Sequence, residues 1–315
     1  MANKIIFMGT PLFCVPILKS LYQNGYNIVV VFTQPPQKSH RGQKINKSPI
    51  QGICETLNID FRSPNSLKDN NEEMEYLKSI NADLAIVVAY GQIIPKEFLK
   101  LTKKGFINIH ASILPKWRGA APIQRAIMNL DKETGLSIMQ IEEDLDTGPI
   151  CNIYRINIEN NLNTEELSDK LSYLAAEKIL DNIDDIFEDK AKFIKQDHAN
   201  ATYAFKIEKS EGQINWKDNS KKIIGKINGL YPKPGAFFIF KGERHKILRA
   251  EIGNGQGKPG EVLTDSLEIA CGDRQSIKIR EIQRQGKKKQ NLGEFLLGTQ
   301  IKKGLFLNEQ ISNIN

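Results

Sequence analysis

The chain has 315 residues, of which 40% are hydrophobic and 26% are charged, an ordinary composition for a globular protein. No run approaches the roughly 18 apolar residues that a membrane span requires, so we expect a cytoplasmic protein. The four cysteines show no Cys-x-x-Cys spacing and are therefore predicted to be buried, reduced thiols rather than zinc ligands or disulfides. The length exceeds one average domain, so two domains are expected.

The positive charge is concentrated in the last third of the chain. Residues 207–315 hold 20 Lys and Arg against 12 Asp and Glu, whereas residues 1–206 hold 24 against 25. A basic module attached to a near-neutral one predicts that the near-neutral part performs chemistry and the basic part holds a polyanion, most simply nucleic acid. A basic surface that only improves solubility is the alternative.

Strand-like and helix-like segments alternate over the first part of the chain. The patterns predict strands at 4–8, 28–32, 84–89 and 106–110, and helices at 15–24, 49–57 and 72–80. This βαβ alternation predicts an α/β fold with a doubly wound, mostly parallel, Rossmann-like sheet. The turn after the first strand, Gly9-Thr-Pro11, lacks the Gly-x-Gly-x-x-Gly spacing of a dinucleotide site, so no nicotinamide cofactor is expected.

A strand at 150–156 and a long amphipathic helix from Thr164 to about Glu188 complete the first predicted domain, residues 1–189. Residues 190–206 are predicted to be a linker. Five short strand-like segments follow in the basic part, at 235–240, 245–250, 260–263, 267–271 and 276–282. Short strands separated by Gly, Pro and Asp predict a small β-barrel of the OB-like type as the C-terminal domain, residues 207–315.

Asn108 and His110 stand at the end of the predicted strand 106–110. Residues two apart on a strand point to the same face, so this strand would deliver an amide donor beside an imidazole, at the sheet edge where α/β sheets bind ligands. Asp146 lies in the turn Asp146-Thr-Gly148 and can orient an imidazole. Acyl transfer to an amine needs an oxyanion donor and a proton carrier, and it needs no metal and no enzyme nucleophile. A hydrogen-bonded core histidine and an ordinary Asp turn are the plainer interpretations.

Motifs around these residues resemble the 10-formyltetrahydrofolate-dependent formyltransferases, and the likeness extends over almost the whole chain. They are Asn108-Ile-His110, Ser112-Ile-Leu-Pro115, Arg118-Gly-Ala-Ala-Pro122 and Asp146-Thr-Gly148. By this resemblance, Asn108, His110 and Asp146 match the catalytic trio. The folate-contacting stretch is matched by Ser112, Ile113, Leu114 and Pro115. Leu12 departs from the family, whose members usually carry Asp at that position.

The resemblance implies transfer of the formyl group of 10-formyltetrahydrofolate to the α-amine of methionine on initiator transfer RNA, with the C-terminal barrel holding the RNA. Residues 37–47 carry four cations and no acid. They match a family loop that inserts at the acceptor stem, which makes Arg41 and Lys44 predicted RNA contacts, although composition alone slightly favours a solvated loop. In the barrel, Lys287, Lys288 and Lys289 are candidates for phosphate contacts. A monomer is expected.

Two other functions remain open at this stage. A formyltransferase of the same fold could act on a small amine such as glycinamide ribonucleotide or an amino sugar, but such a substrate needs neither a basic domain nor the Arg41 loop. A non-enzymatic RNA-binding protein with a decayed catalytic domain would have no need of Asn108, His110 and Asp146 together.

Overall fold

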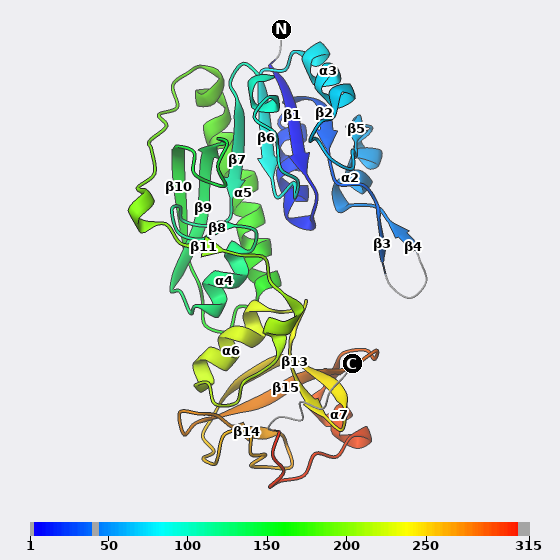
Figure 1. Ribbon diagram of the computed structural model, residues 1–315, viewed down its shortest axis with the longest axis vertical. Helices are drawn as coiled ribbons and strands as arrows, with labels where there is room; N and C mark the ends of the chain where they lie inside the picture. Colours follow the sequence, from blue (N-terminus) through cyan, green and yellow to red (C-terminus); the bar gives the residue numbers. More distant parts are fainter. Residues whose placement is uncertain (1–2, 40–43, 308–315) are drawn as a thin grey trace. The chain divides into compact units, whose positions relative to one another are not determined.

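The computed structural model describes residues 3–39 and 44–307, and the chain forms two compact units (Figure 1). The first unit comprises Met1–Pro122, Thr134–Ile156 and Ser168–Ala204, and the second comprises Ile123–Glu133, Asn157–Leu167 and Phe205–Asn315. No helix within the described ranges is long and apolar enough to cross a membrane.

A seven-stranded sheet forms the centre of the first unit, in the order β10-β9-β7-β6-β1-β2-β5. Its strands are β1 (Lys4–Gly9), β2 (Asn27–Phe32), β5 (Phe61–Arg62), β6 (Leu84–Val88), β7 (Phe106–His110), β9 (Glu133–Gln140) and β10 (Ile150–Asn157). The five strands from β7 to β5 are parallel, and β9 runs antiparallel to β7. The predicted α/β class and mostly parallel sheet are confirmed.

The helices in the described chain before residue 190 fall close to the bounds that the sequence predicted, except for Pro122–Met128, which was not predicted. They are α1 (Val15–Gln23), α2 (Pro49–Leu57), α3 (Asn71–Ile80), α4 (Pro122–Met128) and α5 (Thr164–Phe187), with 3-10 turns η1 (Leu12–Cys14), η2 (Phe98–Lys100), η3 (His198–Asn200) and η4 (Lys209–Gly212). Helix α2 begins after Ser48, whose hydroxyl accepts the Gln51 N–H, and ends at Asn58 in the left-handed conformation. Helix α5 begins with a reciprocal capping box between Asn163 and Glu166.

The sheet is apolar along whole strands because both of its faces are covered. Every residue of β6 is buried, and Ile5 to Met8 of β1 are fully buried. The loops at the carboxyl ends of these strands are tied together, since the Thr10 hydroxyl donates to the Tyr90 carbonyl at 2.8 Å and accepts the Gln34 N–H at 3.2 Å. The edge of the sheet where parallel strands end is therefore a fixed platform.

Two small pairs of strands lie outside the main sheet. An antiparallel hairpin, β3 (Gln37–Ser39) and β4 (Lys44–Asn46), occupies the loop that the sequence analysis left without regular structure. A parallel pair joins β8 (Arg118–Gly119) to β11 (Tyr203–Ala204), so the segment 190–206, predicted as a linker, contributes a strand to the first unit.

The second unit is built on an antiparallel, curled sheet that forms a half-barrel. Its strands are β12 (Ala236–Phe240), β13 (Glu243–Gly253), β14 (Glu268–Ala270), β15 (Ser276–Arg284) and β16 (Gln290–Asn291), with helices α6 (Ser220–Gly229) and α7 (Leu292–Gly298). Four of the five predicted strands are present. The predicted strand at 260–263 is wrong, because Glu261 and Val262 make only isolated bridges. The sheet contains β16 instead, which pairs with β15 and was not predicted.

The four cysteines are free, and three of them are buried as the sequence predicted. Burial raises the pKa of Cys14, Cys54 and Cys271 to about 12 in each case, so these thiols stay protonated at neutral pH. Cys151 is half-buried, and burial raises its pKa as well.

His245 lies inside the second unit among aromatic rings. Its ring stacks on Phe238 at a centroid distance of 5.4 Å and meets Phe240 and Phe295 edge-on at 6.1 and 5.7 Å. Nδ1 donates to the Glu243 carbonyl at 3.1 Å, whereas Nε2 is buried and has no hydrogen-bond partner among the described residues. Burial therefore lowers the pKa of His245 below its ordinary value of 6.5.

We expect acidification to destabilise the second unit through His245. Its pKa is lower in the folded than in the unfolded state, so its contribution is intact above about pH 6.5 and is lost as the pH falls, by at most about 1.4 kcal/mol per pH unit. His245→Phe should flatten the dependence of the unfolding free energy on pH. Urea unfolding between about pH 7.5 and 5.5, followed by the fluorescence of Trp216 in a Trp117→Phe background, measures this. If His245→Phe leaves the slope of unfolding free energy against pH unchanged, His245 is not the group responsible. The same substitution at the exposed His198 is the control.

Candidate active site

Asn108, His110 and Asp146 come together at the carboxyl end of β7. The Asn108 side-chain amide donates to Asp146 Oδ1 at 3.3 Å, and His110 Nδ1 lies 3.6 Å from Asp146 Oδ2. The side chains of His110 and Asp146 are 7% and 12% exposed, so the cluster is largely withdrawn from solvent. One carboxylate thus joins the two strand residues.

A backbone carbonyl determines which nitrogen of His110 carries its hydrogen. Nε2 lies 2.9 Å from the carbonyl oxygen of Trp117. A carbonyl can only accept, so Nε2 is the protonated nitrogen of the neutral ring. Nδ1, which faces Asp146, is then the atom at which His110 can gain or lose a proton.

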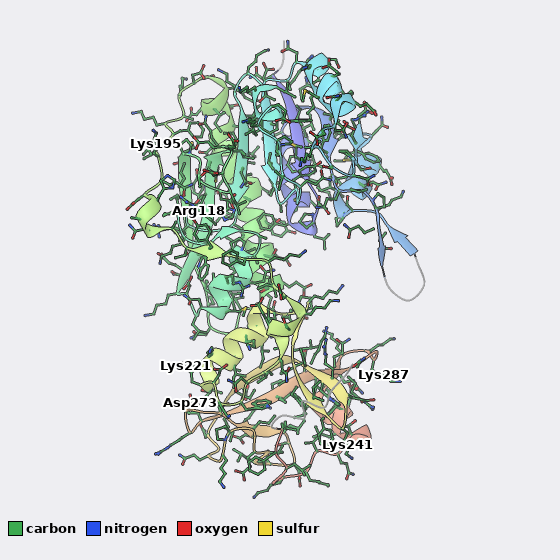
Figure 2. The ribbon with its side chains drawn as sticks, viewed as in Figure 1. Arg118, Lys195, Lys221, Lys241, Asp273 and Lys287 are labelled. Carbon is green, nitrogen blue, oxygen red and sulfur yellow. The ribbon has the colours of Figure 1, made fainter. Side chains whose placement is uncertain are left out.

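Gly119 holds the Asp146 side chain from the other side. Its N–H donates to Asp146 Oδ2 at 2.8 Å. Gly119 has φ of 119°, and a Cβ there would lie 2.8 Å from the Ala204 carbonyl oxygen, so only glycine fits. It belongs to β8 together with Arg118, which Figure 2 labels within the first unit. The structure therefore explains the glycine of the motif Arg118-Gly119.

The segment Ser112–Pro115 follows β7 directly and is held from β9. The Ser137 hydroxyl accepts the Leu114 N–H at 3.0 Å and donates to the Ser112 carbonyl at 2.8 Å. The Ser112 hydroxyl donates to the Lys116 carbonyl at 2.6 Å, and Ser112 and Leu114 are buried. Only Ile113 and Pro115 of the four predicted folate-contacting residues thus present partly exposed side chains.

Sequence reasoning missed Ser137, although a hydroxyl inside the apolar run of β9 was a sign. Ser137 is fully buried and lies opposite His110 in the register of β7 with β9. A buried hydroxyl needs hydrogen-bond partners, and both of its partners are in the loop that follows β7.

The predicted RNA contacts lie on both units, and the structure describes only part of them. Arg41 lies outside the described residues, as does the side chain of Lys44. Lys287 lines a cavity of about 480 Å³ in the second unit, and neither Lys288 nor Lys289 is among the residues that line it.

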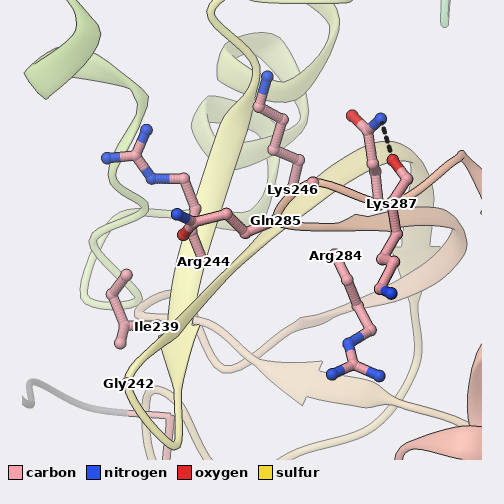
Figure 3. Close-up of a pocket in the computed structure, with 9 residues that line it drawn as sticks. Ile239, Gly242, Arg244, Lys246, Arg284, Gln285 and Lys287 are labelled. Atoms are coloured by element: carbon pink, nitrogen blue, oxygen red, sulfur yellow. Dashed lines mark hydrogen bonds between the residues drawn. The ribbon is translucent and has the colours of Figure 1, made fainter. Parts of the chain in front are cut away.

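Four cations line that cavity, and Figure 3 shows their side chains. They are Arg244, Lys246, Arg284 and Lys287. The Arg244 guanidinium lies over the Phe237 ring at 4.0 Å, and Arg284 pairs with Glu243 at 2.9 Å. Burial, with the nearby charges of Arg244 and Lys233, lowers the pKa of Lys246. The concentration of positive charge around this cavity indicates a surface suited to an anion.

Comparison with known proteins places both halves of the chain in one family. The model for formyl transferase matches residues 3–183, and the model for the formyl transferase C-terminal domain matches residues 206–300.

The chain belongs to the formyltransferase family. It is 68% identical over 304 residues to a methionyl-tRNA formyltransferase of Pelagibacter ubique, covering 96% of this chain and 98% of the relative. A methionyl-tRNA formyltransferase of Jannaschia is 43% identical and is covered over 99% of its length.

Two solved structures share the fold. The sugar 3N-formyl transferase WlaRD, determined in the presence of dTDP and 5-N-formyl-THF, aligns with a TM-score of 0.67 at 21% identity, over 91% of this chain and all of that one. HypX from Aquifex aeolicus, in complex with tetrahydrofolic acid, aligns with a TM-score of 0.64 at 18% identity, over 97% of this chain and 51% of that one. The family uses a formyl-tetrahydrofolate donor.

Ser137→Ala should loosen the segment of this formyltransferase that follows β7. The change leaves the Leu114 N–H and the Ser112 carbonyl without a partner, so we expect a loss of about 1–3 kcal/mol in unfolding free energy. Hydrogen exchange of the Leu114 amide, measured on peptides covering 111–118, should accelerate. Thr134→Val is the matched control, because Thr134 is a buried hydroxyl of the same strand without a hydrogen-bond partner in the described part of the chain. Equal exchange in the wild type and Ser137→Ala would contradict this role.

Proposed function

We propose that the protein transfers the formyl group of 10-formyltetrahydrofolate to the α-amine of methionyl initiator transfer RNA. The observation that carries the proposal is the shared Asp146 carboxylate, which joins Asn108 and His110 at the carboxyl end of β7 in a member of the formyltransferase family. The reaction forms a bond between the amine nitrogen and the formyl carbon and breaks the bond from that carbon to N10 of the folate. One proton passes from the amine to N10.

Asn108, His110 and Asp146 divide this work in the proposed mechanism. The Asn108 amide has two N–H groups, of which one donates to Asp146 and the other is available to the oxygen that becomes negative in the tetrahedral intermediate. Asp146 Oδ2 and His110 Nδ1 face each other and can pass on the proton that the attacking amine releases. The Trp117 carbonyl keeps the ring in the orientation that this transfer requires.

The residues that would hold the formyl donor are those of the segment Ser112–Pro115. Its partly exposed side chains, Ile113 and Pro115, are apolar and suit contact with a flat heterocycle. The donor supplies the formyl group, and the hydrogen bonds to Ser137 keep this surface in place for it.

We assign RNA binding chiefly to the C-terminal domain, residues 207–315, and catalysis to residues 1–189. The cationic cavity around Lys246 and Lys287 would take phosphates, which position an RNA without reading its sequence. Lys288, with Arg41 and Lys44 of the sequence segment 37–47, completes the proposed contacts. The protein would act as a monomer in the cytoplasm.

The acceptor is tested by supplying labelled 10-formyltetrahydrofolate with methionyl initiator transfer RNA, glycinamide ribonucleotide or an amino sugar nucleotide. We expect label in the transfer RNA alone. Label in a small amine would replace the proposal by a formyltransferase of the same fold. Bound RNA without any transfer of label would favour a non-enzymatic RNA-binding protein.

His110→Ala should lower turnover with methionyl transfer RNA by about 10²-fold or more, because proton transfer loses its carrier. The affinity for the transfer RNA should stay nearly unchanged, since the side chain is buried in the site. Single-turnover rates and filter binding measure the two quantities. A loss of RNA affinity with unchanged turnover would contradict the role given to His110.

Lys246→Gln should weaken RNA binding and reduce the slope of log affinity against log salt by about one, as expected for one lost phosphate contact. Turnover at saturating RNA should be unchanged. Lys221→Gln on α6 removes the same charge from an exposed position outside the cavity and is the matched control. Equal salt slopes for the two variants would exclude the cavity from the RNA site.

A further inference from the structure

Gln196 is a buried amide that contacts the backbone on both sides of the Asp146-Thr-Gly148 turn. It is 7% exposed and lies in the segment 190–206. Its side-chain N–H groups donate to the carbonyl oxygens of Asp146 at 2.9 Å and Gly148 at 2.7 Å. One side chain therefore closes the turn that carries the carboxylate.

Arg118 determines which way this amide points. Its Nε and Nη2 donate to Gln196 Oε1 at 3.1 and 2.7 Å. A guanidinium can only donate, so the amide oxygen must face Arg118 and the NH₂ must face the two carbonyls. A flipped Gln196 amide would place its NH₂ against the Arg118 guanidinium and its oxygen against the two carbonyl oxygens, and these hydrogen bonds could not form.

The charge of Arg118 strengthens this contact. The residue is 2% exposed, and no carboxylate among the described residues lies within ion-pair distance of its guanidinium. Its guanidinium donates to Gln196 and lies 3.3 Å from His198 Nδ1. A hydrogen bond from a charged donor is stronger than a neutral one, and it polarises the amide toward its own acceptors.

The backbone of the Asp146 turn gives a reason for such support. Asp146 has φ of 53°, in the left-handed region that residues other than Gly adopt at a cost in free energy, although Asn and Asp adopt it more often than most. The short strand β8 supports it twice, since the Gly119 N–H holds the carboxylate and Arg118 holds the amide that holds the main chain. Strand β11, from the same segment as Gln196, pairs with β8.

We propose that Gln196, oriented by Arg118, is a positioning residue that fixes the Asp146 carboxylate against His110 and Asn108. This inference rests on the proposed formyl transfer. The hydrogen bonds of Gln196 go to Arg118 and to the carbonyls of Asp146 and Gly148, so Gln196 acts on the two strand residues through the turn. Through this one side chain, the segment 190–206 supports the site in addition to connecting toward the C-terminal domain.

Gln196→Glu is the sharpest variant, because it keeps the size and the acceptor for Arg118 but sets an oxygen against the Asp146 and Gly148 carbonyls. We expect kcat to fall by about 10- to 100-fold, since small misplacements of a reacting group have effects of this size. The KM values for both substrates should change less than about twofold. Lys195→Gln, at the exposed neighbouring position that Figure 2 labels, should leave kcat unchanged.

A second variant removes the risk that Gln196→Glu fails to fold. Gln196→Met has a similar length and brings no charge, and it should give the same loss of kcat with a folded far-UV circular dichroism spectrum. Wild-type kcat in a folded Gln196→Met would overturn the inference. So would a rise in KM that accounts for the whole loss.

A double-mutant cycle separates positioning from general damage. In an Asp146→Asn background, Gln196→Met should lower kcat by less than about twofold further, because the group that it positions is already disabled. Fully additive losses would overturn the inference. If Asp146→Asn itself leaves kcat unchanged, the role given to Asp146 in the proposed function fails, whatever Gln196 does.

Discussion

The Asp146 carboxylate is the group around which the first unit arranges its site. It accepts from the Asn108 amide and the Gly119 N–H and faces His110 Nδ1. A mostly buried carboxylate is tolerable only when polar partners surround it, so the two segments that supply these groups, β7 and β8, must come together at Asp146. The carboxyl ends of the parallel strands and the short β8 bring these groups to the same place. Much of the remaining loop structure serves to keep this one carboxylate in place.

The two units differ in what they bury and in how they carry charge. The first buries continuous apolar strands so that a few polar groups can be held rigidly at one sheet edge, where partial exclusion of water strengthens their interactions. The second spreads charge over a half-barrel and tolerates cations close together at its surface, as the lowered pKa of Lys246 indicates. A reaction between a small donor and a large polyanion needs both properties, and one sheet cannot supply them at once.

The sequence predicted the features that depend on local patterns of residues. The start of α2 follows from Ser48 and Pro49, and β7 was predicted because Phe106, Ile107 and Ile109 make it apolar around its two polar residues. The strand expected at 260–263 failed because Glu261 and Val262 bridge to Phe306 and Ile269 singly rather than as a ladder. Gln196 could not be found, because it lies 50 residues from Asp146 and nothing in its own neighbourhood marks it. Arg118 lies in a quoted motif, yet its burial depends on that distant amide.

The unusual amine of Lys246 has a practical consequence. An ammonium group whose pKa is lowered by burial and by neighbouring cations is uncharged more of the time than an ordinary lysine, and only the uncharged amine is nucleophilic. Acylating reagents should therefore modify Lys246 earlier than its fully solvated neighbours. The residue is a natural reporter group: its protection from such reagents would give a footprint of whatever anion occupies the cavity, without any engineered label.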